Sequence, residues 1–368
     1  MNYYLISGEA SGDLHGANLM KAIKETDPQA NFRFLGGDLM QAEGGHLVKH
    51  YSEMAFMGFV EVVMNLRTVL RNIKMVKQDL IKNRPDALVL IDFPGFNLKI
   101  AEFAKENGIK VFYYISPKVW AWNQKRVLKI KKVVDHLYCI LPFEVEFYRS
   151  WGMEVDYVGN PLLDAIASSE PNENFRSQND LNEKKIVALL PGSRRQEVSS
   201  ILKDMLEVAE QFPDYEFVIA GAPTFTQAYY DALMPGQKLK VVFGQTYDLL
   251  RNSEAAIVTS GTATLETALF HVPQIVVYKG NKISIAIARL VIKIRFISLV
   301  NLIMDKLVVK ELIQEDCNPI QIMKELNALL RDKPYRSSML KDYEELSDKM
   351  GEPGASKRTA ELILKELR

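Results

Sequence analysis

Leu190-Pro191-Gly192-Ser193-Arg194-Arg195 and Thr259-Ser260-Gly261-Thr262-Ala263-Thr264-Leu265-Glu266 are the two most informative stretches of this chain. Each stretch follows an apolar run with β-branched residues and leads into an amphipathic one, which predicts a strand, a turn and a helix. Peptide N–H groups at a helix start lack partners within the helix and lie at the positive end of its dipole, so a diphosphate suits both turns. Glu266 is placed to accept both hydroxyls of a ribose, and Arg194 to bridge phosphate oxygens. The turns therefore predict a nucleotide-diphosphate pocket formed by Gly192, Ser193, Arg194, Ser260, Gly261, Thr262 and Glu266.

Short strand-like runs alternate with helical patterns along the chain. They lie at residues 3–7, 32–35, 87–92, 111–115 and 136–141, and again at 186–190, 217–220, 239–243, 255–259 and 274–277. This rhythm is typical of α/β proteins, and the polar stretch 168–174 separates two similar halves. We expect two Rossmann-like, doubly wound parallel-sheet domains over 1–167 and 175–345, followed by a C-terminal helix over 346–368. Ligands of such sheets bind beyond the carboxyl ends of the strands, so the turns and Asp92 are expected to face a cleft between the domains.

Composition narrows the class of protein. The 368 residues are 48% hydrophobic, which is enough apolar material for two cores. Lys plus Arg and Asp plus Glu both number 46, so the overall charge does not call for nucleic acid as a partner. Cys139 and Cys317 are far apart in apolar surroundings, which fits the cytoplasm and excludes a disulfide framework. Residues 1–8 are expected to form a strand and not a signal peptide.

The first turn, residues 8–16, follows a strand-like run but matches neither the dinucleotide-binding nor the P-loop pattern. Its small residues would let a substrate approach Glu9, Ser11 and Gly12 closely, with helix amides available for a phosphate. A tight turn in which Ser11 caps the helix is an equal alternative.

Asp92 ends the apolar run 88–91, where burial would raise its pKa toward a value useful for a general base. The alternative is that Asp92 caps the turn at Pro94. No Asp-x-Asp pair occurs, so we expect a site without a metal ion or cofactor, in which Arg194 and helix amides balance the charge of the leaving group. His46 and His50 have helical i, i+4 spacing without the glutamate of a zinc hydrolase, and are interpreted as surface or packing residues.

Two basic segments are candidates for contact with a membrane. Residues 118–132 combine six basic side chains with Trp120 and Trp122, which suits an anionic bilayer or a substrate phosphate; single-stranded nucleic acid and a solvated helix face are the alternatives. Residues 279–310 hold two apolar runs separated by basic residues, too short to span a bilayer. That segment is either a peripheral membrane surface or a helix buried between domains or in a dimer interface.

Six stretches together resemble the lipid-A-disaccharide synthase family of bacterial glycosyltransferases. They are SGEASGD (7–13), MQAEG (40–44), MGFVEV (57–62), SPKVWAW (116–122), LPGSR (190–194) and SGTATLE (260–266). The resemblance covers nearly the whole chain, and the stretches occur in the order of the family.

The resemblance implies a GT-B glycosyltransferase that joins UDP-2,3-diacylglucosamine to 2,3-diacylglucosamine 1-phosphate and releases UDP, on the inner face of the cytoplasmic membrane. It implies that Asp92 and Arg194 are the residues associated with activity. It also implies that the N-terminal domain binds the acceptor and that the UDP pocket lies in the second domain. Asn301 and Gln314 match a region that is exchanged between the two chains of a dimer in the family, which implies a homodimer in which they complete the partner's site.

Two other functions stay open from the sequence. A UDP-N-acetylglucosamine 2-epimerase needs the same diphosphate turns but has no use for basic amphipathic surface. A non-catalytic protein that binds a nucleotide at the membrane surface would bind UDP without transferring a sugar.

Overall fold

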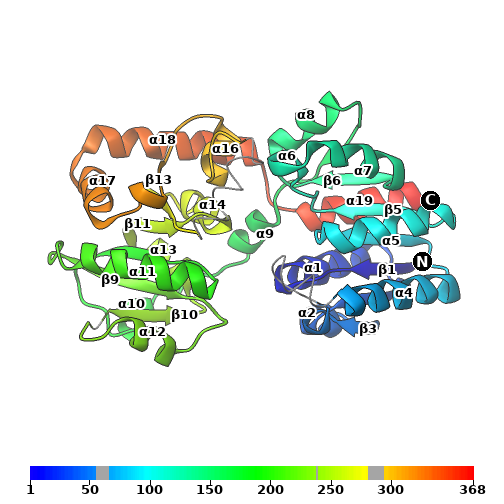
Figure 1. Ribbon diagram of the computed structural model, residues 1–368, viewed down its shortest axis with the longest axis horizontal. Coiled ribbons are helices and arrows are strands. Elements are labelled where there is room, and N and C mark those ends of the chain that lie inside the picture. The colour runs from blue at the N-terminus through cyan, green and yellow to red at the C-terminus, as the bar shows by residue number, and fades with distance from the viewer. Residues whose placement is uncertain (55–65, 238, 281–293) are drawn as a thin grey trace. The chain divides into compact units, whose positions relative to one another are not determined.

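The computed structural model describes residues 1–54, 66–237, 239–280 and 294–368. The stretch at 57–62 and the first apolar run of the 279–310 segment, residues 283–288, lie outside the described residues. The chain divides into two compact units: residues 1–165 with 352–368 form unit 1, and residues 166–351 form unit 2. Both units are layered α/β structures (Figure 1).

Unit 1 is built on seven parallel strands in the order β3-β2-β1-β4-β5-β6-β7. The strands are β1 (Asn2–Ile6), β2 (Asn31–Gly36), β3 (His46–His50), β4 (Ala87–Ile91), β5 (Lys110–Tyr114), β6 (His136–Cys139) and β7 (Asp156–Tyr157). The helices are α1 (Ala10–Thr26), α2 (Asp38–Ala42), α4 (Leu66–Asn83), α5 (Pro94–Glu106), α6 (Val119–Trp122), α7 (Val127–Val133), α8 (Pro142–Ser150), α9 (Pro161–Ala167) and α19 (Ala355–Leu367).

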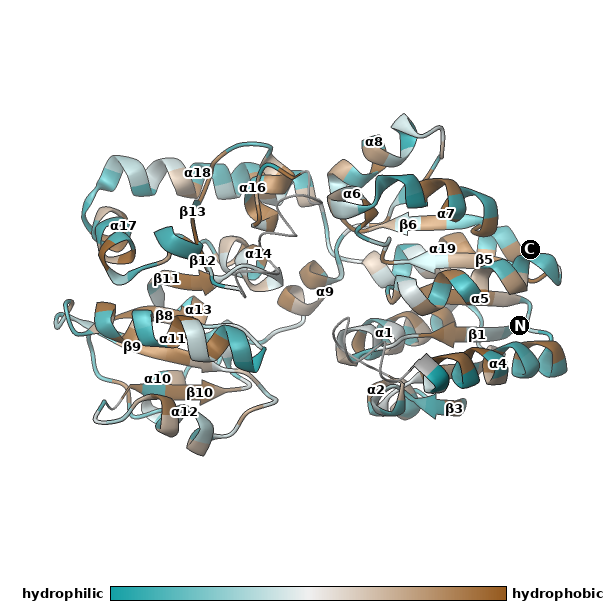
Figure 2. Ribbon diagram, viewed as in Figure 1, coloured by the Kyte–Doolittle hydropathy of each residue, from teal (hydrophilic) through white to brown (hydrophobic). Residues whose placement is uncertain are grey.

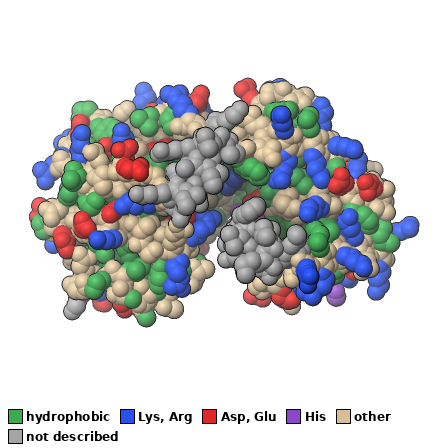
Figure 3. Space-filling view, viewed as in Figure 1, with side chains coloured by type: hydrophobic (Ala, Val, Ile, Leu, Met, Phe, Trp, Pro, Cys, Tyr) green, Lys and Arg blue, Asp and Glu red, His purple; other side chains and the backbone are tan. Residues whose placement is uncertain are grey.

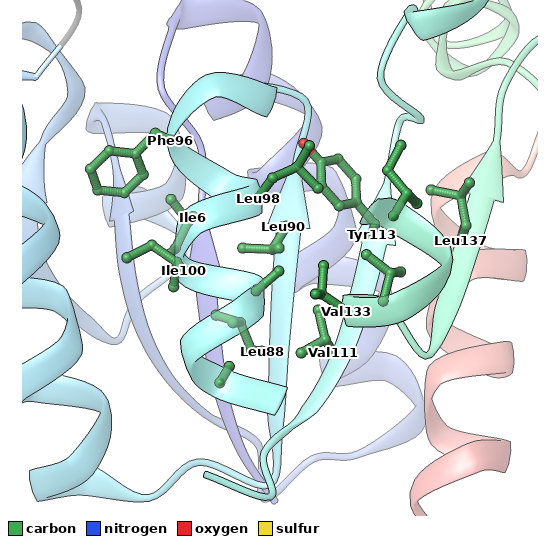
Figure 4. Close-up of a cluster of buried hydrophobic side chains, with 14 of the residues drawn as sticks. Ile6, Leu88, Leu90, Phe96, Leu98, Ile100, Val111, Tyr113, Val133 and Leu137 are labelled. Atoms are coloured by element: carbon green, nitrogen blue, oxygen red, sulfur yellow. The ribbon is translucent and has the colours of Figure 1, made fainter. Parts of the chain in front are cut away.

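Alternation along the strands gives the sheet of unit 1 two apolar faces. On β4, Leu88 and Leu90 join one core cluster, whereas Val89 and Ile91 join the other. Because parallel strands are buried on both faces, helices must cover each side. Figure 4 shows the first cluster, in which Leu98 and Ile100 of α5 pack toward the strands. The second cluster includes α1 and α19, so the end of the chain returns to cover the first unit.

Unit 2 repeats the design with six parallel strands in the order β10-β9-β8-β11-β12-β13. The strands are β8 (Lys185–Leu190), β9 (Tyr215–Gly221), β10 (Lys240–Phe243), β11 (Ser253–Thr259), β12 (Gln274–Tyr278) and β13 (Lys310–Ile313). The helices are α10 (Phe175–Gln178), α11 (Arg195–Ala209), α12 (Gln227–Leu233), α13 (Thr246–Arg251), α14 (Thr262–Leu269), α16 (Leu299–Met304), α17 (Pro319–Arg331) and α18 (Lys333–Met350). Strands β9 and β11 are strongly hydrophobic (Figure 2), as strands covered on both faces must be.

The interpretation of His46 and His50 as surface or packing residues is confirmed, since they lie at the two ends of strand β3 with His46 exposed and His50 half-buried. The structure corrects two other sequence interpretations. The second apolar run of the 279–310 segment is buried inside unit 2, where Phe296 and the side chains of α16 are enclosed and α16 contacts α14 and α18. The expected helix over 346–368 is instead the end of α18, a break with a positive φ at Gly351, and α19. Within the described residues, no helix is both long and apolar enough to cross a membrane.

A buried carboxylate fixes the first crossover of unit 1. Asp13 of α1 is 3% exposed, and it accepts hydrogen bonds from the backbone N–H groups of Gly37, Leu39 and Met40 at 2.7–3.1 Å. These are amide groups at the start of α2, which have no partners inside the helix. Asp13 therefore ties α1 to the turn after β2.

Replacing Asp13 with Ala should lower the free energy of unfolding by about 3 kcal/mol, because buried amides lose a charged acceptor. Urea unfolding followed by circular dichroism measures the change. Asp38→Ala is the matched control: its side chain is 93% exposed, and its loss from the first turn of α2 should cost less than about 1 kcal/mol. Equal costs for the two variants would contradict the anchoring role of Asp13.

Candidate functional site

The strand order of each sheet reverses at one place. In unit 1 the chain moves outward from β1 to β3 and then returns to place β4 beside β1; in unit 2 it moves from β8 to β10 and returns to place β11 beside β8. Crossovers leave in opposite directions at such a point, which opens a crevice beyond the carboxyl ends of the two strands. The turns after β1 and β4 hold Glu9 and Asp92, and the turns after β8 and β11 hold Arg194 and Gly261. All the turns predicted from the sequence therefore lie at the two reversal points.

The backbone of the Asp92 turn is strained. Asp92 and Phe93 have φ values of 43° and 48°, a left-handed conformation that non-glycine residues rarely adopt. Three contacts hold the main chain of Asp92: its N–H donates to Tyr114 O (3.2 Å), and its carbonyl accepts from Tyr113 Oη (2.5 Å) and Asn97 Nδ2 (2.8 Å). Strain of this kind persists only where the surroundings enforce it, and it clusters at functional sites.

Close packing joins this turn to the one after β1. A Cβ atom on Gly8 would lie 2.4 Å from Cγ of Phe93, so only glycine fits there. Glu9 is the N-cap residue of α1, and Ser11 Oγ donates a hydrogen bond to Glu9 Oε1 at 2.8 Å. The alternative that Ser11 caps the helix is therefore wrong. Gly12 has no side chain, and its backbone is buried against Ser7. Of the three predicted residues, only Glu9 and Ser11 therefore offer groups to a ligand.

The Asp92 carboxyl group is in an environment that suits a general base. Burial raises its pKa above the usual value, Lys118 lowers it, Glu9 raises it, and the N–H of Phe93 lowers it. The N-cap residue of α5 is Phe93, and no side chain caps that helix. The structure therefore does not bear out the capping alternative for Asp92.

Glu144 organises the loop that carries Lys118 and was missed from the sequence. It is 1% exposed; Oε1 accepts from Ser116 Oγ (2.6 Å) and Trp120 Nε1 (3.1 Å), and Oε2 accepts from the N–H groups of Ile140 and Leu141 (3.2 and 3.0 Å). Burial raises the pKa of this glutamate. Its position two residues after Pro142, at the start of a helix, was the only signal in the sequence.

The first glycine turn of unit 2 already holds an anion of its own. Glu197 Oε2 accepts from the N–H groups of Ser193 and Arg194, both at 3.3 Å, and Oε1 accepts from Arg194 Nη1 at 2.8 Å. Gly192 has φ 104°, and a Cβ atom there would lie 2.7 Å from Glu197 Oε2. The structure corrects the expectation that this turn offers free amides: its Ser193 and Arg194 amides are occupied, while the Arg194 side chain is 72% exposed.

The second glycine turn is open. Gly261 is the N-cap residue of α14, and no side chain of the described residues caps that helix. Gly261 and Thr262 are both exposed, whereas Ser260 Oγ donates to the carbonyl of Ile297 at 2.9 Å. The first amides of α14 therefore remain available to an anion, at the positive end of the helix dipole.

Glu266 lies one turn into α14, half-buried, as the sequence predicts for a ribose-binding carboxylate. Its Oε1 accepts a hydrogen bond from Tyr247 Oη at 3.1 Å. Burial raises the pKa of Glu266, and the hydrogen bond from Tyr247 lowers it. Tyr247 itself was not among the predicted residues.

Asn301 and Gln314 have partners within their own chain. Asn301 is fully buried: Nδ2 donates to Val309 O and Glu311 Oε1, and Oδ1 accepts from the N–H groups of Val308 and Val309, which uses its whole hydrogen-bonding capacity. Gln314 pairs with both backbone groups of Gly280. It lines a pocket of about 280 Å³ with Gln196, Ser200, Lys279, Gly280 and Glu315. A role for either residue in a partner chain, and the homodimer itself, stay predictions.

Comparison with known proteins identifies the family. The lipid-A-disaccharide synthetase family matches residues 3–366. The lipid-A-disaccharide synthase of Syntrophus aciditrophicus is 41% identical over 370 residues, covering 98% of this chain and 96% of that protein. That of Trichlorobacter lovleyi is 38% identical over 367 residues, with the same coverage of 98% and 96%.

Solved structures show the same two-domain architecture. A UDP-GlcNAc 2-epimerase from Methanocaldococcus jannaschii, in complex with UDP-GlcNAc and UDP, aligns with a TM-score of 0.68 at 15% identity over 99% of this chain and 100% of that one. The glycotransferase of kitacinnamycin aligns with a TM-score of 0.67 at 12% identity over 100% and 99%. The predicted fold class, two doubly wound parallel-sheet domains of the GT-B type, is confirmed. The chain belongs to the lipid-A-disaccharide synthase family, the glycosyltransferases of lipid A biosynthesis.

Proposed function

We propose that this chain joins UDP-2,3-diacylglucosamine to 2,3-diacylglucosamine 1-phosphate in a β-1′,6 linkage and releases UDP. The observation that carries the proposal is that each unit has its own reversal point and that the two reversal points differ in chemistry. That of unit 1 presents a strained turn with a half-buried carboxylate, and that of unit 2 presents an open helix start beside an exposed arginine and a half-buried glutamate. The family membership supports the same chemistry.

In the proposed mechanism, the ionised Asp92 takes the proton of the acceptor 6-hydroxyl while that oxygen attacks the anomeric carbon. UDP leaves from the opposite face, so the configuration inverts in one displacement. Arg194 and the amides at Gly261 and Thr262 stabilise the charge that grows on the diphosphate, an effect worth about 3–4 kcal/mol for each preorganised donor. The charge is balanced in this way without a metal ion.

Mass spectrometry of the products tests the proposal. Purified protein given both lipid substrates should form a disaccharide monophosphate, and no product should appear when either substrate is left out. Turnover of UDP-N-acetylglucosamine without an acceptor would instead favour an epimerase. Binding of UDP with no transfer would favour a non-catalytic nucleotide-binding protein.

The role of Asp92 predicts a specific pH profile. Asp92→Asn should lower kcat by about 10²–10⁴-fold and leave UDP affinity unchanged, because it removes the proton acceptor and not the nucleotide site. The acid limb of kcat/KM should follow the raised pKa of Asp92. Lys118→Ala removes a cation that favours the ionised carboxylate, so the pKa should rise further and the acid limb should move to higher pH.

Lys125→Ala is the control for Lys118→Ala, because Lys125 is an exposed lysine of the same segment that does not affect the pKa of Asp92. Identical acid limbs in the wild type and in Lys118→Ala would contradict the assignment of that limb to Asp92. Equal losses of kcat and UDP affinity in Asp92→Asn would indicate a structural role.

The acylated substrates imply contact with the inner face of the cytoplasmic membrane, and the segment 118–132 fits this role. Trp120 is buried against Phe143, but Trp122 is 46% exposed. The Arg126 guanidinium lies over the Trp122 ring, 5.1 Å from its centroid. Leu128 is 60% exposed. Lys and Arg side chains are frequent on the face over α6 and α7 (Figure 3). Exposed tryptophan and leucine among basic residues are typical of surfaces that dock on anionic lipid.

We expect the double variant Trp122→Ser, Leu128→Ser to bind vesicles containing phosphatidylglycerol at least about tenfold more weakly than the wild type, because two apolar anchors are lost. Co-sedimentation with vesicles measures binding, which should weaken further in high salt. Leu307→Ser is the control, since Leu307 in unit 2 is also 60% exposed. Wild-type binding by the double variant would contradict this docking surface.

A further inference from the structure

Tyr247 is held in place by a column of contacts inside unit 2. Its ring lies 5.0 Å from that of Phe270, and the guanidinium of Arg251 lies 5.1 Å from the Phe270 centroid. Arg251 is fixed in turn, because Nη1 donates to Asp248 Oδ1 at 3.1 Å and Nη2 donates to the carbonyl of Ser169 at 2.6 Å. The Tyr247 hydroxyl therefore has a set position from which it donates to Glu266.

We infer that Tyr247 is a positioning residue that orients Glu266 toward the two hydroxyls of a ribose, so that this chain selects ribonucleotides over 2′-deoxyribonucleotides. The inference rests on the proposed function, because it assumes that unit 2 binds UDP. It adds a residue that no sequence motif indicates.

The chemistry of the pair supports this role. A carboxylate offers about four acceptor positions, and Tyr247 takes one of them on Oε1. The remaining positions suffice for a vicinal diol, provided that the carboxylate does not rotate. Fixing the side chain before binding avoids the entropic cost of ordering it afterwards. The same hydrogen bond also favours the ionised form of Glu266, the form that accepts from two hydroxyl groups, against the effect of burial.

The experiment is isothermal titration of the full-length protein with UDP and with 2′-deoxy-UDP. The wild type should prefer UDP. In Tyr247→Phe, which keeps the ring and its contact with Phe270, the ratio of the two affinities should fall by about three- to tenfold, the size expected for one lost hydrogen bond. Tyr335→Phe is the matched control, since Tyr335 of α18 also donates to a glutamate of unit 2, Glu325, but neither residue belongs to a predicted nucleotide-binding turn. The affinity ratio of this variant should equal that of the wild type.

A double-mutant cycle separates positioning from a general structural effect. Because Tyr247 acts through Glu266, the Tyr247→Phe change should have no effect on the affinity ratio in a Glu266→Ala background. The inference would be overturned if Tyr247→Phe left the affinity ratio unchanged, including by weakening both nucleotides in parallel, or if the change had an equal effect in both backgrounds. Neither outcome would contradict the proposal that unit 2 binds UDP. A wild type that binds neither nucleotide would instead overturn the proposed function, and this inference with it.

Discussion

The reversal of strand order in each parallel sheet determines where the polar turns of this protein lie. Crossover helices cover both faces of each sheet, and only where consecutive crossovers diverge do the carboxyl ends of neighbouring strands stay open. Asp92 and Glu9 lie at that point in unit 1, and Arg194 and Gly261 lie at that point in unit 2. The same sheet geometry thus places chemically different turns in equivalent positions.

The two glycine turns of unit 2 differ in whether a carboxylate of the chain itself binds their backbone amides. At the start of α11 the chain supplies its own carboxylate, Glu197, which takes the backbone donors and one arm of Arg194. At the start of α14 no side chain does so within the part of the chain that the structure describes. A diphosphate therefore competes with an internal anion at one helix and not at the other. On this ground we propose that the diphosphate binds at the start of α14 and contacts Arg194 of the neighbouring turn.

The sequence alone predicted most strands, because runs such as 87–92 and 186–190 are apolar throughout, as strands covered on both faces must be. It missed β3, β7 and β13, which are strands at the sheet edges, where burial no longer imposes a clear pattern. Glu144 and Tyr247 were missed for a different reason. Their side-chain partners lie 19 to 28 residues away, and no local spacing in the sequence indicates such contacts.

A crystal structure of the protein with UDP would show which helix start binds the diphosphate. We expect diphosphate oxygens within hydrogen-bonding distance of the first amides of α14 and of the Arg194 side chain, ribose hydroxyls on Glu266, and Glu197 still bound to the amide of Ser193. A diphosphate that displaces Glu197 at the start of α11, or a uridine bound away from Glu266, would contradict this expectation.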